Sequence, residues 1–356
     1  MTVTEAAALA ILGNRDRRLL AAILRVISGR ATLEDREALP ERDANESLIG
    51  WACRCRGSNS VEELKQLASE AAAQLANATR LGFVALPLFD PRYPTLLAAI
   101  PDPPPLLWLR GQVAALHAPA IAIVGSRGAT PYGLAMAARL ATDLAVAGLV
   151  IVSGLARGID SAAHAATVSA KRKTIGVLGC GIDRIYPSEH RDLASEMEHN
   201  GAVVSEFPPR VPPLQHHFPL RNRIISGLSS AVVVVEAGEK SGALITAGAA
   251  LEQGREVLVV PGPATGGRNR GGHQLIRDGA KLVENAADIL QEISAACGIA
   301  PIPPLEAVTI PQSLDFTVDD VAARTGEPPS VVLARLLELE LTGRVKRIGG
   351  GRFVRV

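Results

Sequence analysis

The stretch IAIVGSRGATPYGLAMAARLA, residues 121–141, decides the fold. Its first residues, Ile121 to Val124, are apolar at every position, which is typical of a strand buried on both faces. A turn of glycine and serine follows, and the alanine-rich remainder predicts a helix. The turn has neither the spacing of a dinucleotide fingerprint nor that of a Walker loop, and Arg127 stands in its middle. The sequence therefore predicts a strand, a turn and a helix. The turn is expected to bind a ligand other than those of a dinucleotide fingerprint or a Walker loop.

The same pattern recurs between residues 120 and 288. Short runs of valine and isoleucine alternate with alanine-rich helical stretches; these runs are LVIVSG, TIGVLG, AVVVVEA and EVLVVPG. Strands that are apolar on both faces and separated by helices form parallel sheets covered on both sides. We therefore expect an α/β protein with an extended Rossmann-like, doubly wound sheet.

Composition shifts divide the chain into a helical domain over residues 1–80 and the sheet domain over residues 81–295. Residues 296–313 are rich in proline and small residues, which predicts a linker. Residues 314–356 combine two short helical patterns with two β-prone runs around three glycines. This order is typical of a winged helix-turn-helix.

The composition of the chain, 356 residues with 47% hydrophobic and 21% charged residues, predicts a soluble globular protein. The formal net charge is only +1, so any affinity for nucleic acid must come from local clusters of basic residues. No segment resembles a signal peptide or a membrane span. The four cysteines lack the spacing of a zinc site or a disulfide framework, which favours the cytoplasm; they are Cys53, Cys55, Cys180 and Cys297.

Basic and small residues follow the predicted strands, where a parallel sheet presents its ligand-binding edge. Glycine lets a phosphate approach the backbone, and arginine offers a planar donor fork for it. For the first turn alone, a solvated arginine accounts for the sequence equally well. The candidates in the first two turns are Gly125, Ser126, Arg127, Gly154 and Arg157.

Three further segments add basic residues to this edge. Residues 216–229 contain no acid and are expected to form a basic loop before a strand. A helix start and a glycine-rich loop come later in the chain. The candidates in these segments are Arg221, Arg223, Lys240, Ser241, Arg268 and Arg270. So many separate basic turns indicate a ligand with several phosphates.

Asp160 and His164 stand four residues apart on a predicted helix. They could form a metal pair or include a general base, but a helix cap at Asp160 and a packed His164 are favoured. No metal site, cofactor or catalytic residue is predicted.

The motifs VGSRGATPYG, SGLARGIDSAAH, GCGIDRIYP, FPLRNRIISGLS, SGALITA and LIRDGA closely resemble those of the DNA-processing protein A family, DprA, also called Smf. The resemblance implies a homodimer that binds single-stranded DNA, helps to load the RecA recombinase during natural transformation and has no established catalytic activity. It places basic DNA contacts at Arg127, Arg157, Arg221 and Arg223. It also places dimer contacts at Leu275 and Ile276, although the sequence alone fits equally well with both residues lying in the core of one chain. The chain departs from the family at His190 and His273, where asparagine is usual.

Two alternatives remain. Rossmann-like nucleotide phosphoribohydrolases resemble this architecture, and Glu236 or Glu252 would then be the working acid, although their PGGxGTxxE pattern is absent. The winged helix could instead be the DNA reader, binding a duplex or docking a protein through its basic tail. The basic residues of that tail are Arg344, Lys346, Arg347, Arg352 and Arg355.

Overall fold

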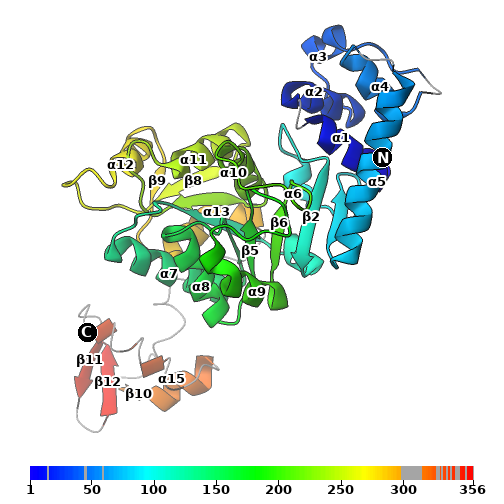
Figure 1. Cartoon of the computed structure of the whole chain (residues 1–356). Coiled ribbons are helices and arrows are strands. Elements are labelled where there is room, and N and C mark those ends of the chain that lie inside the picture. Colours follow the sequence, from blue (N-terminus) through cyan, green and yellow to red (C-terminus); the bar gives the residue numbers. More distant parts are fainter. Residues whose placement is uncertain are drawn as a thin grey trace. The chain divides into compact units, whose positions relative to one another are not determined.

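The computed structural model falls into two compact units, Met1–Ile289 and Leu290–Val356 (Figure 1). The described residues are 1–13, 16–43, 46–57, 60–297, 315–325, 329, 332–333, 336, 339–340, 345–348 and 351–355. The predicted linker lies outside the described residues from position 298 onward.

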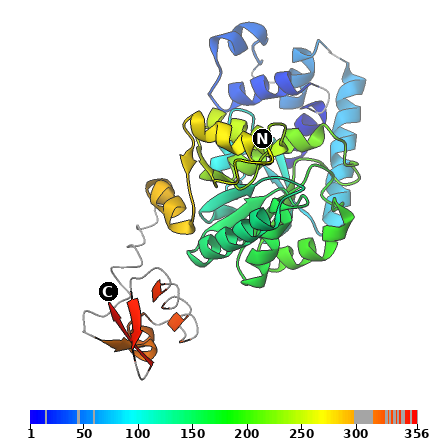
Figure 2. The same ribbon diagram turned by 90° about the vertical axis from the view of Figure 1, so that its left-hand side faces the viewer.

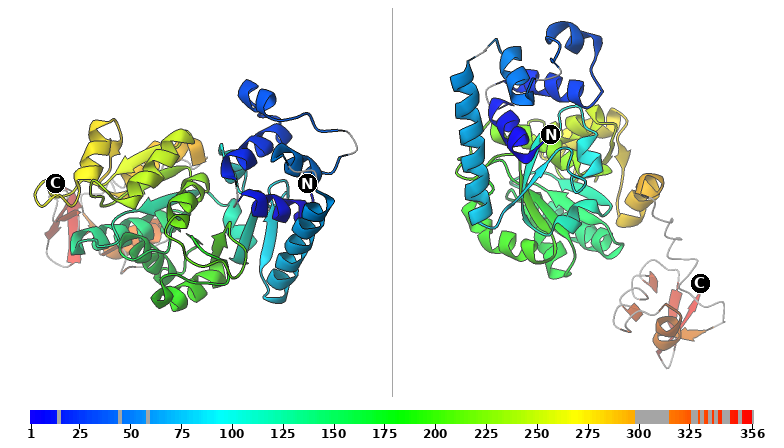
Figure 3. Two further views of the ribbon diagram at one scale, coloured as in Figure 1. Left: turned by 45° about the horizontal axis from the view of Figure 1, so that its top comes forward. Right: turned by 90° about the vertical axis from the view of Figure 1, so that its right-hand side faces the viewer.

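The chain begins with a group of helices whose N-termini carry side-chain caps. Asp16, Thr32, Ser47 and Ser60 each accept a hydrogen bond from a backbone amide in the first turn of the helix that follows, which satisfies a donor that the helix leaves free. Helices α1 and α5 pack against the first strand of the sheet (Figure 3). The helices are α1 (Val3–Gly13), α2 (Arg17–Ile27), α3 (Leu33–Ala38), α4 (Leu48–Cys55) and α5 (Val61–Arg80).

A nine-stranded sheet forms the centre of the first unit, in the order β1-β2-β6-β5-β4-β3-β7-β8-β9. The strands from β3 to β9 are parallel, and β1 and β2 are antiparallel additions at one edge. The bounds are β1 (Val84–Pro87), β2 (Leu106–Gly111), β3 (Ala120–Val124), β4 (Val150–Ser153), β5 (Thr174–Val177), β6 (Ala202–Ser205), β7 (Ala231–Val234), β8 (Glu256–Val259) and β9 (Lys281–Leu282). The doubly wound α/β prediction is confirmed.

Helices cover both faces of this sheet (Figure 2). One face carries α7 (Pro131–Val146), α8 (Ile159–Ser169) and α9 (Arg191–Asn200). The other carries α10 (His217–Gly227), α11 (Gly242–Glu252) and α12 (Arg270–Arg277). The remaining helical elements are α6 (Thr95–Ala98), η1 (Val113–His117), η2 (Ser188–His190) and α13 (Ala286–Cys297).

The expectation of a basic loop over residues 216–229 is wrong, because helix α10 occupies most of this segment. Its apolar residues Ile224 and Ile225 are buried, and so is Arg221, one turn earlier. The buried arginine shares a helical face with the isoleucines, so the basic residues belong to a packed helix rather than to a solvated loop.

The strand order reverses direction beside β3. From β3 the chain builds outward through β4, β5 and β6, whereas β7 pairs with the other side of β3 and leads to β8 and β9. The loops after β3 and β7 therefore run to opposite faces of the sheet and leave a crevice between them. Such a switch point is where open α/β sheets bind ligands.

In the described part of the second unit, a three-stranded antiparallel sheet has the order β10-β12-β11, and helix α15 packs against β10. Phe316 and Phe353 are fully buried at its centre. The predicted winged-helix fold is confirmed. The elements are β10 (Phe316–Thr317), α15 (Val318–Thr325), β11 (Val345–Ile348) and β12 (Arg352–Arg355). Arg344 and the side chain of Arg355 lie outside the described residues.

In the part of the chain that the structure describes, no helix combines the length and the apolar character needed to cross a membrane.

Candidate nucleic-acid interface

A pocket of about 560 Å³ occupies the switch point. Its walls come from the β3–α7 loop, the loop after β4, the first turns of α10 and the start of α11. We call it the switch pocket. It brings together the sequence candidates Gly125, Ser126, Arg127, Arg221, Lys240 and Ser241.

The β3–α7 loop is held by tight backbone contacts. A Cβ atom on Gly125 would lie 2.5 Å from Ile159, and one on Gly158 would lie 2.2 Å from the carbonyl oxygen of Ser126. The amide of Ser126 donates to the carbonyl of Glu236 over 2.7 Å, which joins this loop to the one after β7. The loop therefore presents Arg127 from a fixed backbone.

Arg221 lies at the bottom of the switch pocket with only 4% of its surface exposed. Its Nη1 donates to the carbonyls of Gly154, over 2.6 Å, and Val177, at the ends of β4 and β5. Its Nε donates to Asn222 Oδ1 over 3.0 Å. Among the described residues, no carboxylate forms an ion pair with this guanidinium, although the charge of Asp160 acts on it. A buried cation without a direct ion pair is costly, and an anion in the pocket would supply one.

The pKa of Arg221 is lowered to about 10. Burial is the main cause, the charge of Asp160 opposes it, and the charge of Arg127 adds to it. A bound anion would raise this pKa again, because it stabilises the protonated guanidinium.

Asp160 was expected to cap helix α8, and this expectation is wrong. Gly158 is the N-cap, and Asp160 is the second residue of the helix. Its Oδ2 accepts from the amides of Gly154 and Ala156, so the carboxylate orders the loop after β4. Burial raises the pKa of Asp160, and the charge of Arg221 and these amides offset only part of that rise.

The rim of the pocket carries the exposed cations Arg127 and Lys240. The guanidinium of Arg127 lies over the ring of Phe218, with its Cζ 5.4 Å from the ring centroid. Phe218 in turn contacts Tyr186, whose ring centroid is 5.5 Å away. The rim therefore offers both positive charge and one aromatic surface.

The N-terminus of α11 completes the pocket with Ser241 and Thr246, hydroxylic residues whose position at a helix start indicates phosphate contact, whereas sequence reasoning missed Asn222. Ser241 is the N-cap and accepts from the amide of Ala243. Asn222 and Thr246 also line the pocket, and both are buried. Asn222 donates to the carbonyl of Gly242 over 3.2 Å. Asn222 lies in the motif FPLRNRIISGLS and Thr246 in the motif SGALITA, so both motifs pointed to this part of the chain.

Gly154 leaves space for the buried arginine. A Cβ atom at this position would lie 2.1 Å from Arg221 Nη2. The amide of Gly154 donates to Asp160 and its carbonyl accepts from Arg221, so both backbone groups of Gly154 have partners within the protein.

Three other candidates lie outside the switch pocket. Arg157 forms a two-pronged ion pair with Glu189, both distances being 2.7 Å. Arg268 donates to the carbonyl of Gly128, and Arg270 lies 3.4 Å from Glu239. All three side chains remain on the surface near the β3–α7 and β7–α11 loops.

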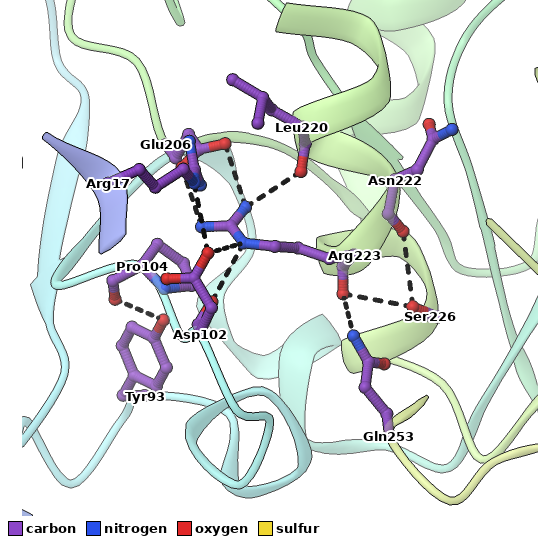
Figure 4. A network of polar contacts seen from close by, with 10 residues as sticks. All are labelled: Arg17, Tyr93, Asp102, Pro104, Glu206, Leu220, Asn222, Arg223, Ser226 and Gln253. Carbon is purple, nitrogen blue, oxygen red and sulfur yellow. Dashed lines mark hydrogen bonds and ion pairs between the residues drawn. The ribbon is translucent and has the colours of Figure 1, made fainter. Parts of the chain in front are cut away.

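Arg223 belongs to a different cluster, which Figure 4 shows from close by. It pairs with Asp102 at 3.0 Å and with Glu206 at 2.9 Å. Arg17 from α2 contacts the same two carboxylates at 3.1 and 2.7 Å. The side chain of Asn222 points away from this cluster. Arg223 therefore helps to join the N-terminal helices to the sheet.

The two departures from the family pattern keep a hydrogen bond. His190 Nδ1 donates to the carbonyl of Leu155 over 2.9 Å, and His273 Nε2 donates to that of Gly262 over 3.0 Å. An asparagine amide could donate in the same way. Leu275 and Ile276 are half-buried and pack partly on the core of their own chain.

Two residues that enzyme alternatives would use, Glu236 and His164, have structural partners. The carboxylate of Glu236 accepts from the hydroxyl of Thr130 over 2.6 Å and from its amide. His164 is fully buried with Nδ1 against the Thr174 hydroxyl, as the packing interpretation expected. Within the described ranges, no three metal-ligating side chains gather at one point.

Comparison with known proteins decides the family. Residues 85–294 match the model of DNA recombination-mediator protein A, and residues 311–351 match the DprA winged helix domain. The chain belongs to the DprA family. The resemblance drawn from the motifs is thereby confirmed.

Similar proteins cover most of the chain. Protein Smf of Escherichia coli is 43% identical over 73% of this chain and 74% of its own length. The X-ray structure of DprA from Streptococcus pneumoniae has a TM-score of 0.64 and 39% identity over 69% of this chain and 87% of that one. DprA from Helicobacter pylori, described as binding single-stranded DNA in a unique mode, has a TM-score of 0.55 and 30% identity over 60% of this chain and 96% of that one.

Proposed function

We propose that this DprA-family chain is a recombination mediator that binds single-stranded DNA in the switch pocket. The observation that carries the proposal is Arg221, a buried cation without a carboxylate partner among the described residues, beneath the exposed cations Arg127 and Lys240. Single-stranded DNA binding by the Helicobacter pylori relative supports the choice of ligand.

In this proposal the pocket cations neutralise backbone phosphates, and each contact releases counterions from the strand. Gly125 and Ser126 let the backbone approach, and Ser241 with the α11 N-terminus adds partial positive charge. Arg157, Arg268 and Arg270 lie near the same loops and extend the track. Arg223 is not part of the proposed interface because Asp102, Glu206 and Leu220 already occupy its donors.

Base recognition is expected to be slight. Only 3% of the residues are aromatic, and Phe218 is the aromatic side chain that lines the pocket. Proteins that bind single strands through base stacking use several such rings. Affinity should therefore vary little between oligonucleotides of different sequence.

We further propose that the bound strand is passed to RecA during natural transformation. The test is RecA filament formation on single strands coated with single-stranded-DNA-binding protein, with and without this protein. We expect faster nucleation with the native chain and with Arg92→Ala, a surface control that keeps the pocket, and loss of the effect with Arg127→Ala. Equal stimulation by all three proteins would contradict a role for the pocket in loading.

We also propose a homodimer through α12, where Leu275 and Ile276 are half-buried in one chain. Burial by a second copy would account for apolar residues that their own core leaves partly open. Sedimentation of the Leu275→Glu variant tests this placement, because an acid in the interface should yield monomers; a dimer that persists would refute it.

The winged helix is proposed as an auxiliary site for duplex DNA or a protein. Lys346 and Arg347 on β11 are exposed, while Arg352 pairs with Asp315 at 2.8 Å. The cytoplasm is the proposed location, which the free thiols of Cys53, Cys55 and Cys180 support.

A further inference from the structure

The polar groups of the switch pocket lie at two depths. Arg127 and Lys240 stand on the exposed rim. Arg221, Asn222 and Thr246 lie at the bottom and expose only 4%, 8% and 2% of their surfaces. A ligand can therefore contact Arg127 and Lys240 at the rim without contacting the buried residues at the bottom.

The bottom of the pocket keeps donors that the protein does not use. Among the described residues, Thr246 Oγ1 has no hydrogen-bond partner, although the residue is almost wholly buried. The Nη2 of Arg221 likewise has none within the described ranges, whereas its Nε and Nη1 are fully engaged. Both residues line the switch pocket, and neither atom is among the solvent-inaccessible side-chain atoms that lack a partner, so both atoms are open to the pocket and can donate to a ligand that enters it.

The chemistry of these donors specifies an anion. The N-terminal turn of α11 directs its amides toward the same volume, with Ser241 as its cap. The carboxylate that lines the pocket, Asp160, is held by the amides of Gly154 and Ala156. The bottom of the pocket thus combines one guanidinium, one hydroxyl and a helix N-terminus.

Depth distinguishes two kinds of phosphate. A phosphodiester within a strand carries a sugar on each side, so both sugars would have to enter the pocket for its oxygens to reach Arg221. A phosphate at the end of a strand carries one sugar and presents three terminal oxygens. It also bears close to two negative charges at neutral pH, against one for a phosphodiester.

We infer that the bottom of the switch pocket binds the terminal phosphomonoester of a DNA strand, while the rim binds internal phosphates. Arg221 and Thr246 donate to the terminal oxygens, and Arg127 and Lys240 hold the backbone that leaves the pocket. This inference rests on the proposed single-stranded DNA function and adds recognition of the strand end.

The test compares short dT oligomers that carry a 5′-phosphate, a 3′-phosphate or only hydroxyl ends, with a circular dT strand as the ligand without ends. Binding to the full chain is measured by competition against one labelled strand. We expect one phosphorylated end to bind about tenfold more tightly than the hydroxyl-ended strand, since charge-assisted hydrogen bonds are added. If the strand with the 5′-phosphate binds more tightly, the pocket recognises the 5′ end, and if the strand with the 3′-phosphate does, it recognises the 3′ end. Equal affinity of all linear strands would overturn the inference.

Thr246→Val removes the hydroxyl and keeps the side-chain shape. It should abolish most of the preference for the phosphorylated end and leave binding of the circular strand unchanged. The matched control is Thr167→Val, a buried threonine on α8 whose hydroxyl donates to the carbonyl of Ala163 outside the pocket. If Thr246→Val kept the native preference for the phosphorylated end, that end would bind elsewhere, and its assignment to the bottom of the pocket would be overturned.

A measurement on the native chain does not depend on how the variants fold. Thymidine 5′-monophosphate and thymidine 3′-monophosphate should each be compared with thymidine as competitors of the phosphorylated strand, and the monophosphate matching the preferred end should compete better. Failure of every strand, circular ones included, to bind would refute the proposed function itself, whereas binding without an end preference refutes only this inference.

Discussion

Arg223→Met is expected to lower the free energy of unfolding of the first unit by about 3–5 kcal/mol. Arg223 is largely buried, and it shares two carboxylates, Asp102 and Glu206, with Arg17 (Figure 4). The cluster is neutral with two cations and two anions. Removing one cation leaves excess negative charge in a poorly solvated place, and such a loss costs far more than an exposed ion pair contributes.

Urea unfolding at constant pH and salt measures this effect. The control is Arg157→Met, which breaks the exposed pair with Glu189 and should leave stability nearly unchanged. If Arg223→Met stayed as stable as the native protein and instead weakened DNA binding, the structural role assigned to Arg223 would be wrong.

Gly154→Ala is expected to weaken binding of the strand with the preferred phosphorylated end about tenfold and to destabilise the fold by about 1–3 kcal/mol. The added Cβ would lie 2.1 Å from Nη2 of Arg221 and 2.3 Å from its Nη1. The guanidinium must move, and it then loses its hydrogen bonds to the carbonyls of Gly154 and Val177. The positive charge of Arg221 then no longer lies where we expect the terminal phosphate to bind.

The matched control for this variant is Gly248→Ala on α11. Apart from its chain neighbours and the backbone of its own helix, no atom lies within 4 Å of the Cβ added there. The change should stabilise the protein by about 0.5–1 kcal/mol, since alanine favours a helix over glycine, and leave affinity unchanged. Native affinity in Gly154→Ala would show that Arg221 does not contact the ligand.

The sequence was sufficient to predict the doubly wound parallel sheet and its ligand-binding edge, but not the strand order that creates the switch point. Strands such as Ala231–Val234 are apolar on both faces, and so short a run of β-branched residues between helical stretches is typical of a parallel sheet. The turns after β3 and β7 could be paired as one site because parallel strands end at the same edge. The local pattern therefore predicted one shared edge for Arg127, Lys240 and Ser241, and the structure brings all three residues to the switch pocket.

The depth of each side chain could not be predicted in this way. Arg221 and Arg223 are two residues apart, yet one lies beneath the pocket and the other pairs with Asp102 and Glu206. Those acids come from segments far away in sequence, so only the tertiary fold reveals the ion pairs. Asp160 was mistaken for a cap because its true partners, the amides of Gly154 and Ala156, precede it in a loop.

The salt dependence of binding to poly-dT tests the central claim, that cations of the switch pocket neutralise the phosphates of a single strand. Log affinity should fall with log salt by about 0.7 for each phosphate contacted. Arg127→Ala should make the slope shallower by about 0.7, and Arg92→Ala, which removes an exposed arginine paired with Asp90, should leave it unchanged. A slope in Arg127→Ala equal to that of the native chain would contradict the account.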